Sequence, residues 1–365
     1  MLVYINGRFL TQPVTGVQRF ALELLHALDD TLSEHLDLLQ GYQFICLVPA
    51  SSQTRSFPNW KNIAIERKGR LSGNLWEQIE LPFFARKGLL VSLCNIGPVL
   101  HFNQIVIFHD ASVFAVPEAY TFPFKVKYRS IMWVLARTAR QIITVSEFSR
   151  MELAKYLKIN SNNFLLIPEG CEHILKFTPD HSIMERNGLS QKPFILVIGS
   201  ASPHKNINAV IRVIQKLNEN VIDLVIAGGD YAKVFKPVEE TETKHIIRLG
   251  YVNDSELRAL YEHALFLIFP SLYEGFGLPP LEAMACGCPV LSSNRASLPE
   301  IYSQAALYFD PTSQEDIYNK IKEFMESSTL REYHRKMGFS LVKQYTWNSA
   351  AKLLLKAILK NGLRS

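Results

Sequence analysis

Two glutamates and two glycines stand close together in the segment SLYEGFGLPPLEAMACGCPV, residues 271–290. Gly275 and Gly277 allow a tight turn and a close approach of the backbone to a ligand. The prolines that follow favour the start of a helix, whose unpaired N–H groups and dipole suit a diphosphate. Glu274 in the loop and Glu282 in the expected first helical turn can both accept hydrogen bonds from a vicinal diol. The segment therefore predicts a site for a ligand that contains phosphate and ribose or sugar.

Each glutamate also has an ordinary interpretation. Glu274 fits an exposed loop acid, and Glu282 fits a residue that complements the dipole of a first helical turn. The glycines and prolines between the two glutamates favour the ligand site, because a surface acid needs no such backbone.

A lysine follows another expected strand. Lys205 lies in GSASPHKN, residues 199–206, where a strand gives way to a helix. A cation at a helix N-terminus is unfavourably placed unless an anion lies there. The ordinary alternative is a solvated loop lysine. The position therefore suits an anion beside Lys205.

Two positions in the first half lie where ligands bind in open α/β sheets, beyond the carboxyl ends of the strands. His109 directly follows an expected strand, and this placement favours a functional over a structural histidine. Gly16, within PVTGVQRF at residues 13–20, opens the helix after the first expected strand. Its ordinary interpretation is a plain helix start that Thr15 caps.

The elements that must position these residues alternate between short apolar runs and amphipathic stretches. The expected strands are residues 2–5, 43–48, 89–93, 104–108, 141–145, 194–199, 224–227, 245–249, 266–269 and 290–292. The expected helices are residues 17–28, 75–85, 124–140, 147–157, 206–217, 255–264, 281–286, 314–326 and 350–359. Continuous apolar strands that alternate with helices are typical of parallel sheets covered on both faces.

This alternation predicts two doubly wound α/β domains. We expect a first domain at residues 1–178, a second at residues 179–345, and a final helix at residues 346–365 that crosses back to the first domain. The break falls in a polar stretch, residues 177–192, that shows no strand pattern.

Composition narrows the class of protein. The 365 residues carry a formal net charge of +5, and basic and aromatic residues do not interleave as in nucleic-acid-binding modules. No apolar run reaches about 18 residues, and the first residues predict a strand, so we expect neither a transmembrane helix nor a signal peptide. The five cysteines form no framework, and we expect them to be reduced in a cytoplasmic protein.

The residues around the two glutamates resemble a known family. Glu274 and Glu282 enclose seven residues within EGFGLPPLEAMACGCPV, which matches the E-x7-E signature of retaining glycosyltransferases of family 4. The intervening GFGLP and the following A-x-G-x-P-V also fit, and the resemblance extends over essentially the whole chain. It implies the GT-B fold, in which two Rossmann-like parallel-sheet domains face each other across a cleft.

The resemblance also implies roles for single residues. Glu282 would hold the ribose of the donor, while Glu274 and the backbone of residues 275–277 would hold the transferred sugar. His109 would lie beside that sugar, on the acceptor-binding domain. The full set of implied donor-binding residues is Gly16, Ser200, Lys205, Val252, Gly275, Phe276, Gly277, Leu278 and Glu282.

The implied reaction moves a hexose, with mannose favoured, from a nucleoside diphosphate sugar to a saccharide or lipid-linked acceptor in cell-surface polysaccharide synthesis. No cofactor is expected. No metal is expected either, because no Asp-x-Asp motif is present and Asp29 and Asp30 are expected to be solvated. Two alternatives stay open: a nucleotide-sugar epimerase of the same architecture, and a non-catalytic module that binds nucleotide or glycan.

A membrane contact is a further possibility at the expected helix 124–140. Its five basic residues lie among apolar ones. The ordinary interpretation is an amphipathic helix that packs its apolar face inward, and the alternative is a basic face that contacts anionic lipid or a lipid-diphosphate acceptor.

Overall fold

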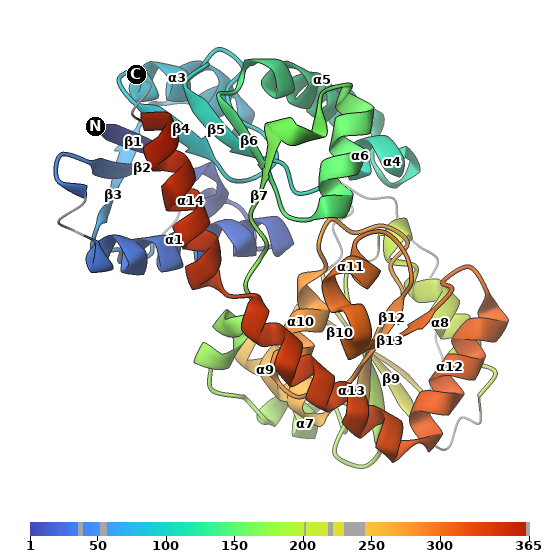
Figure 1. Ribbon diagram of the computed structural model, residues 1–365. Helices are drawn as coiled ribbons and strands as arrows, with labels where there is room; N and C mark the ends of the chain where they lie inside the picture. The colour runs from blue at the N-terminus through green and yellow to red at the C-terminus, as the bar shows by residue number, and fades with distance from the viewer. Residues whose placement is uncertain (36–38, 52–56, 201, 218–221, 230–244, 363–365) are drawn as a thin grey trace. The chain divides into compact units, whose positions relative to one another are not determined.

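The computed structural model describes residues 1–35, 39–51, 57–200, 202–217, 222–229 and 245–362 (Figure 1). The chain forms two compact units. Unit 1 comprises Met1–Ala111, Val126–Gly170 and Trp347–Ser365, and unit 2 comprises Ser112–Lys125 and Cys171–Thr346. Each unit contains one parallel β-sheet.

Unit 1 is built on a seven-stranded sheet in the order β3-β2-β1-β4-β5-β6-β7, and all its strand pairs are parallel. The strands are β1 (Leu2–Asn6), β2 (Gln43–Pro49), β3 (Ile63–Lys68), β4 (Leu89–Ser92), β5 (Gln104–Ile107), β6 (Gln141–Thr144) and β7 (Phe164–Leu166). The central strands are apolar and buried because helices cover both faces of the sheet.

The helices of unit 1 divide between the two faces. They are α1 (Gly16–Glu34), α2 (Gly73–Leu75), α3 (Leu81–Ala85), α5 (Phe122–Thr138), α6 (Glu147–Leu157) and α14 (Trp347–Gly362), and a π-helical turn, Trp76–Glu80, joins α2 to α3. α1 connects β1 to β2, a step along the sheet in the direction of the edge strand β3. The connections β3 to β4 through α2–α3, β5 to β6 through α5, and β6 to β7 through α6 all step in the direction of the other edge strand, β7. Because such crossovers are right-handed, α1 covers one face and the other three connections cover the opposite face. α14 packs along α1 (Figure 1).

Unit 2 is built on a six-stranded parallel sheet in the order β10-β9-β8-β11-β12-β13. The strands are β8 (Phe194–Ile198), β9 (Asp223–Ala227), β10 (Ile246–Gly250), β11 (Phe266–Phe269), β12 (Val290–Ser293) and β13 (Ala306–Phe309). The helices are α4 (Ser112–Ala115), α7 (Ser182–Arg186), α8 (Ile207–Ile214), α9 (Asp254–His263), α10 (Leu278–Ala285), α11 (Leu298–Tyr302), α12 (Gln314–Glu326) and α13 (Ser328–Leu341). Its core lies where α8 and α12 pack on strands β8, β9 and β11.

The predicted α/β class with two parallel-sheet Rossmann-like domains is confirmed. The chain passes from unit 1 to unit 2 after Gly170, while the sequence analysis set the first domain at residues 1–178. The segment 112–125 also clusters with unit 2, although it lies between β5 and β6 of the first sheet. The final helix, α14, belongs to unit 1. None of the helices in the described part of the chain has both the length and the apolar composition to span a bilayer.

The expectation that Asp29 is solvated was wrong. α1 continues to Glu34, so Asp29 lies within the helix and not at its end. Its buried carboxylate accepts hydrogen bonds from the backbone N–H groups of Lys61 (2.8 Å) and Asn62 (2.7 Å). The carboxylate therefore anchors the chain segment that leads into β3.

Candidate functional site

The glycine turn before α10 is shaped by its own neighbours in unit 2. Gly277 has φ +92°, a left-handed conformation that side chains rarely adopt. A Cβ atom at this position would also clash with the hydroxyl of Tyr302, which donates a hydrogen bond to the carbonyl of Gly277 (2.6 Å). Both the conformation and the close approach of α11 therefore require glycine here.

The residues before Gly277 are held from the same side. The buried hydroxyl of Ser297 donates to the carbonyl oxygen of Glu274 (3.0 Å). The same hydroxyl lies 3.3 Å from the carbonyl oxygen of Phe276. The ring of Phe276 packs edge-on against Tyr345, with 5.6 Å between the ring centroids. These contacts fix the backbone of the turn that leads into α10.

Lys205 and Glu274 form an ion pair at the carboxyl ends of two neighbouring strands. The Lys205 Nζ lies 2.6 Å from the Glu274 Oε1, and the two side chains are 21% and 13% exposed. Lys205 follows β8 on a short 3-10 turn, Pro203–Lys205, and Glu274 follows β11, which pairs with β8 in the sheet. The pair thus presents one cation and one carboxylate side by side, both still within reach of solvent.

Glu282 has a different environment from the one expected. α10 begins at Leu278, so Glu282 lies in its second turn, and the interpretation as a first-turn residue that complements the dipole was wrong. The side chain is buried, and its Oε2 accepts a hydrogen bond from the hydroxyl of Tyr261 (2.9 Å). The other oxygen, Oε1, lies 2.9 Å from the Nε2 of His173.

The partners of Glu282 are themselves buried. Burial, and then the charge of Glu282, raise the pKa of Tyr261 well above its usual value. Tyr261 therefore stays a neutral hydrogen-bond donor towards the carboxylate. A carboxylate offers about four acceptor sites, so Glu282 can accept from more than one donor at a time. Neither partner could be predicted from spacing, because each lies far from Glu282 along the chain.

Three other predicted donor residues, Ser200, Val252 and Leu278, also belong to unit 2. Ser200 and Val252 are half-buried in the loops that follow β8 and β10. Leu278 is the first residue of α10 and is buried. The imidazole of His204 bonds to Ser202 (2.7 Å between Nδ1 and Oγ) and stacks on Tyr120, a residue of the segment 112–125.

His109 lies in unit 1, buried at the end of β5. Its Nε2 lies 2.8 Å from the carbonyl oxygen of Leu93, and a carbonyl only accepts, so this nitrogen donates. Its Nδ1 lies 3.8 Å from the Glu169 Oε1, and its ring packs edge-on against Phe20. The orientation of the ring is therefore fixed: Nε2 bonds to the backbone of Leu93, and Nδ1 faces Glu169.

Gly16 begins α1 behind a capping box in which Thr15 and Gln18 bond to each other. The ordinary interpretation, a capped helix start, therefore describes the local structure. A Cβ atom at Gly16 would meet no atom within 4 Å. No neighbour in the described part of the chain therefore requires glycine here, and the open space leaves room for a ligand to approach the backbone.

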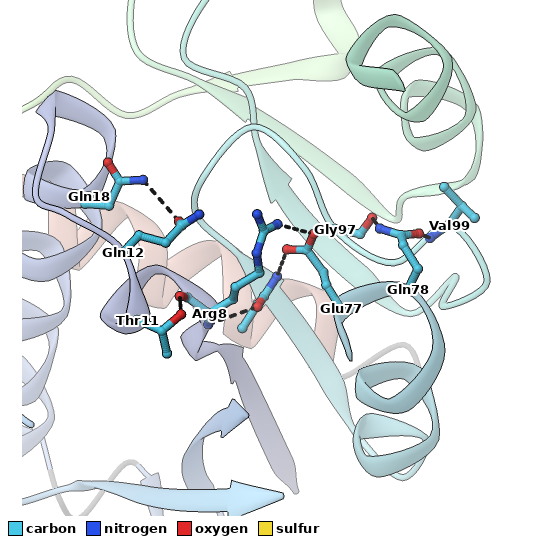
Figure 2. A network of polar contacts seen from close by, with 9 residues as sticks. Arg8, Thr11, Gln12, Gln18, Glu77, Gln78, Gly97 and Val99 are labelled. Carbon is cyan, nitrogen blue, oxygen red and sulfur yellow. Dashed lines mark hydrogen bonds and ion pairs between the residues drawn. The ribbon is translucent and has the colours of Figure 1, made fainter. Parts of the chain in front are cut away.

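A buried charge network lies beyond β1 in unit 1 (Figure 2). Arg8 Nη1 lies 2.6 Å from Glu77 Oε2, and the amide of Asn6 donates to Glu77 Oε1 (2.8 Å). Arg8 Nε is buried and has no hydrogen-bond partner among the described residues. Burial, followed by the charge of Arg8, lowers the pKa of Lys127. This cluster has no signal in the sequence, because its members come from separate segments.

Unit 2 contains Glu274 and most of the predicted donor residues: Ser200, Lys205, Val252, Gly275, Phe276, Gly277, Leu278 and Glu282. Gly16 and His109 belong to unit 1. Within the described ranges, no three His, Cys, Asp or Glu side chains are grouped so that they could hold a metal ion.

Comparisons with known proteins agree with this architecture. The family model for glycosyl transferases group 1 matches residues 180–340. An O-antigen chain mannosyltransferase B of Escherichia coli is 29% identical, and the alignment covers 94% of this chain and 96% of that protein. An O-antigen chain mannosyltransferase of Salmonella typhimurium is 28% identical over 74% of this chain and 75% of its own length.

A solved structure supports the fold. The sucrose-phosphate synthase of Thermosynechococcus elongatus has a TM-score of 0.75 at 16% identity, over 100% of this chain and 99% of that chain. At this identity the likeness concerns the fold alone, and it confirms the predicted GT-B class. The family match over residues 180–340 and the two relatives together support a glycosyltransferase family for this protein.

Proposed function

We propose that the protein is a retaining glycosyltransferase of family 4 that acts without a metal ion. It moves a hexose, with mannose favoured, from a nucleoside diphosphate sugar to a saccharide or lipid-linked saccharide acceptor in cell-surface polysaccharide synthesis. The E-x7-E segment and the similarity to two O-antigen chain mannosyltransferases support this proposal. A lipid-linked acceptor would place the reaction at a membrane surface.

The ion pair between Lys205 and Glu274 is the observation that carries the proposal. The 2.6 Å contact holds a cation and a carboxylate together beside the turn that opens α10. Such a pair can bind both ends of a sugar diphosphate, with Lys205 on a phosphate oxygen and Glu274 accepting from a sugar hydroxyl. The cation and the N-terminal end of α10 neutralise the phosphate charge in this scheme.

We assign the ribose to Glu282, with Tyr261 and His173 as positioning residues. Tyr261 donates a hydrogen bond to one carboxylate oxygen, and His173 lies within ion-pair distance of the other. A carboxylate that is oriented before the ligand arrives loses less entropy on binding. The resemblance alone supports four further assignments. Val252 would contact the nucleobase, and Ser200, Gly16 and Leu278 would lie beside the donor.

Retention follows from front-face attack in this proposal. The acceptor hydroxyl attacks C1 on the side from which the diphosphate leaves, and a departing phosphate oxygen takes the hydroxyl proton. Glu274 is not the nucleophile, because its carboxylate is paired with Lys205 and suits binding of a sugar hydroxyl. His109 is assigned to orienting the transferred sugar through Nδ1.

A screen of nucleoside diphosphate sugars by thermal shift identifies the donor, because a ligand that binds only the folded state raises the Tm. Product anomers are then compared by NMR for the wild type and for Glu274→Ala with added azide. We expect the residual product to keep the donor's anomeric configuration. A glycosyl azide of inverted configuration would show that Glu274 is a missing nucleophile and would overturn the front-face assignment. Inverted product from the wild type would overturn retention itself.

A further inference from the structure

Seven large apolar side chains of unit 1 are exposed to solvent on three neighbouring segments. They are Leu75, Ile79, Phe83, Leu100, Phe102, Val126 and Trp133, which are between 48% and 73% exposed. We call the surface that they form the α3–α5 face. Single exposed apolar residues are common, whereas a set this large on adjoining segments is typical of an interaction surface.

The exposed residues follow the spacing of helical stripes. Leu75, Ile79 and Phe83 are each four residues apart along the continuous helical stretch from α2 to α3. Val126 and Trp133 are seven residues apart on α5. Such spacings place side chains on one side of a helix. Met132 and Leu135 are buried and lie on the side of α5 that packs into the core. Val126 and Trp133 are exposed and lie on another side of the helix.

All three segments cover the same face of the sheet. The right-handed connections through α2–α3 and α5 both run towards β7, as does the loop between β4 and β5 that carries Leu100 and Phe102. The opposite face is covered by α1 with α14 packed along it (Figure 1).

Hydrogen bonds join the three segments. The side chain of Gln78 donates to the carbonyl of Gly97 (2.9 Å) and accepts from the N–H of Val99 (3.1 Å), which ties the loop to the helix beneath it (Figure 2). Asn103 donates to the carbonyl of Gly88 (3.1 Å) and accepts from Arg140 (2.7 Å). The loop is therefore fixed to the end of α3 on one side and to the end of α5 on the other.

The charge of this face is positive. Residues 73–103 and 126–140 contain six basic residues, Arg86, Lys87, Lys127, Arg129, Arg137 and Arg140, and two acidic residues, Glu77 and Glu80. The two carboxylates offset only part of this positive charge. Glu77 is buried against Arg8, and Glu80 accepts from the backbone N–H groups of Arg70 and Leu71.

Basic and aromatic side chains are also in direct contact on this face. The guanidinium of Arg86 lies 4.3 Å from the ring centroid of Phe83, and that of Arg137 lies 3.8 Å from the ring of Trp133. Such pairs place an apolar ring beside a cation. The boundary between lipid headgroups and acyl chains is a surface that accepts both at once.

We propose that the α3–α5 face docks onto the surface of a bilayer that contains anionic lipid. The apolar stripes enter the headgroup region, and the basic residues contact lipid phosphates. The excess of cations favours this occupant over an apolar protein partner. The docking is independent of the donor site, because lipid binding needs neither donor nor turnover.

The test is co-sedimentation of the full chain with phosphatidylcholine vesicles that contain or lack phosphatidylglycerol. We expect binding only to the anionic vesicles, and binding that weakens as salt rises. Ile79→Ser combined with Phe83→Ser, and separately Arg86→Glu combined with Lys87→Glu, should each lower binding about ten-fold.

Matched controls separate the face from general charge and apolarity. Lys352→Glu with Lys356→Glu changes the net charge equally on α14, and Tyr333→Ser removes an exposed aromatic ring in unit 2. Binding that falls as much in these controls would overturn the proposal, as would binding that ignores lipid charge. A stable wild-type dimer that Ile79→Ser with Phe83→Ser makes monomeric would identify a second copy as the occupant and would also overturn it.

Discussion

At the candidate donor site, Glu274 is partly exposed and paired with a cation, while Glu282 is buried and held by two neighbours. The same side-chain type therefore has two environments on one short segment. A partly exposed carboxylate next to a cation can exchange partners when a ligand arrives. A buried carboxylate that keeps its protein partners can accept a ligand hydroxyl only as an additional partner. This suits a contact of fixed geometry to a diol.

Lys205→Ala should weaken binding of the nucleoside diphosphate about ten-fold, because it removes a charge-assisted contact to phosphate. Binding of the corresponding nucleoside should change little. Calorimetry with both ligands measures the difference, and Lys216→Ala, an exposed lysine that bonds to Gln314, is the control. Equal losses for the two ligands, or no loss for the diphosphate, would remove Lys205 from the phosphate site.

His173→Ala should weaken nucleoside binding about ten-fold, because Glu282 loses a partner and its carboxylate is no longer oriented. His173→Gln keeps an N–H donor and should restore part of the affinity. Calorimetry with the nucleoside measures both variants, and His245→Ala, directly before the edge strand β10, is the control. A variant without effect on affinity would leave His173 with a structural role alone.

At the scale of elements, α10 and α11 depend on each other through the glycine turn. Gly277 bonds to Tyr302 on α11, and Ser297, directly before α11, holds Glu274 and Phe276. The turn is therefore not a flexible loop that waits for a ligand. Its shape is set by packing inside unit 2 before any donor binds.

Gly277→Ala should destabilise the fold by about 2 kcal/mol or more, because alanine is strained at positive φ and its Cβ would displace Tyr302. Gly16→Ala is the matched control, since its Cβ would meet no atom of the described chain within 4 Å. Thermal denaturation should show a lower Tm for Gly277→Ala alone. A Gly277→Ala protein with the wild-type Tm would show that α11 shifts to accommodate the Cβ atom. A Gly16→Ala protein with the wild-type Tm but weaker donor binding would support the assignment of Gly16 to the donor site.

At the scale of the whole molecule, the candidate phosphate site relies on fixed protein charges. Lys205 and the start of α10 supply positive charge in unit 2. We expect the rate of glycosyl transfer to be unchanged by EDTA, because these groups neutralise the leaving diphosphate without a divalent ion. Initial rates with and without chelator measure this. Loss of activity in EDTA and its return with Mg²⁺ would contradict the expectation.

Much of the fold could be predicted because its signals are local. Apolar runs such as Phe266–Phe269 mark central strands, and the boundaries of α6 and α12 agree with their predicted ranges. The elements that were missed lack such signals. β3, β7 and β13 lie at sheet edges, β3 carries polar residues, β7 has three residues, and α13 buries only His334 and Gly338. Their positions depend on neighbours rather than on their own pattern.

The sequence by itself determined the glycine turn and the two parallel-sheet domains, because each is encoded in neighbouring residues. Only the tertiary structure decided which distant groups meet. The contact of Lys205 with Glu274 follows from the pairing of β8 with β11, and the contact of Glu282 with His173 joins α10 to the segment just after Gly170. Strand order is a property of the folded chain, so such contacts cannot be read from spacing along the sequence.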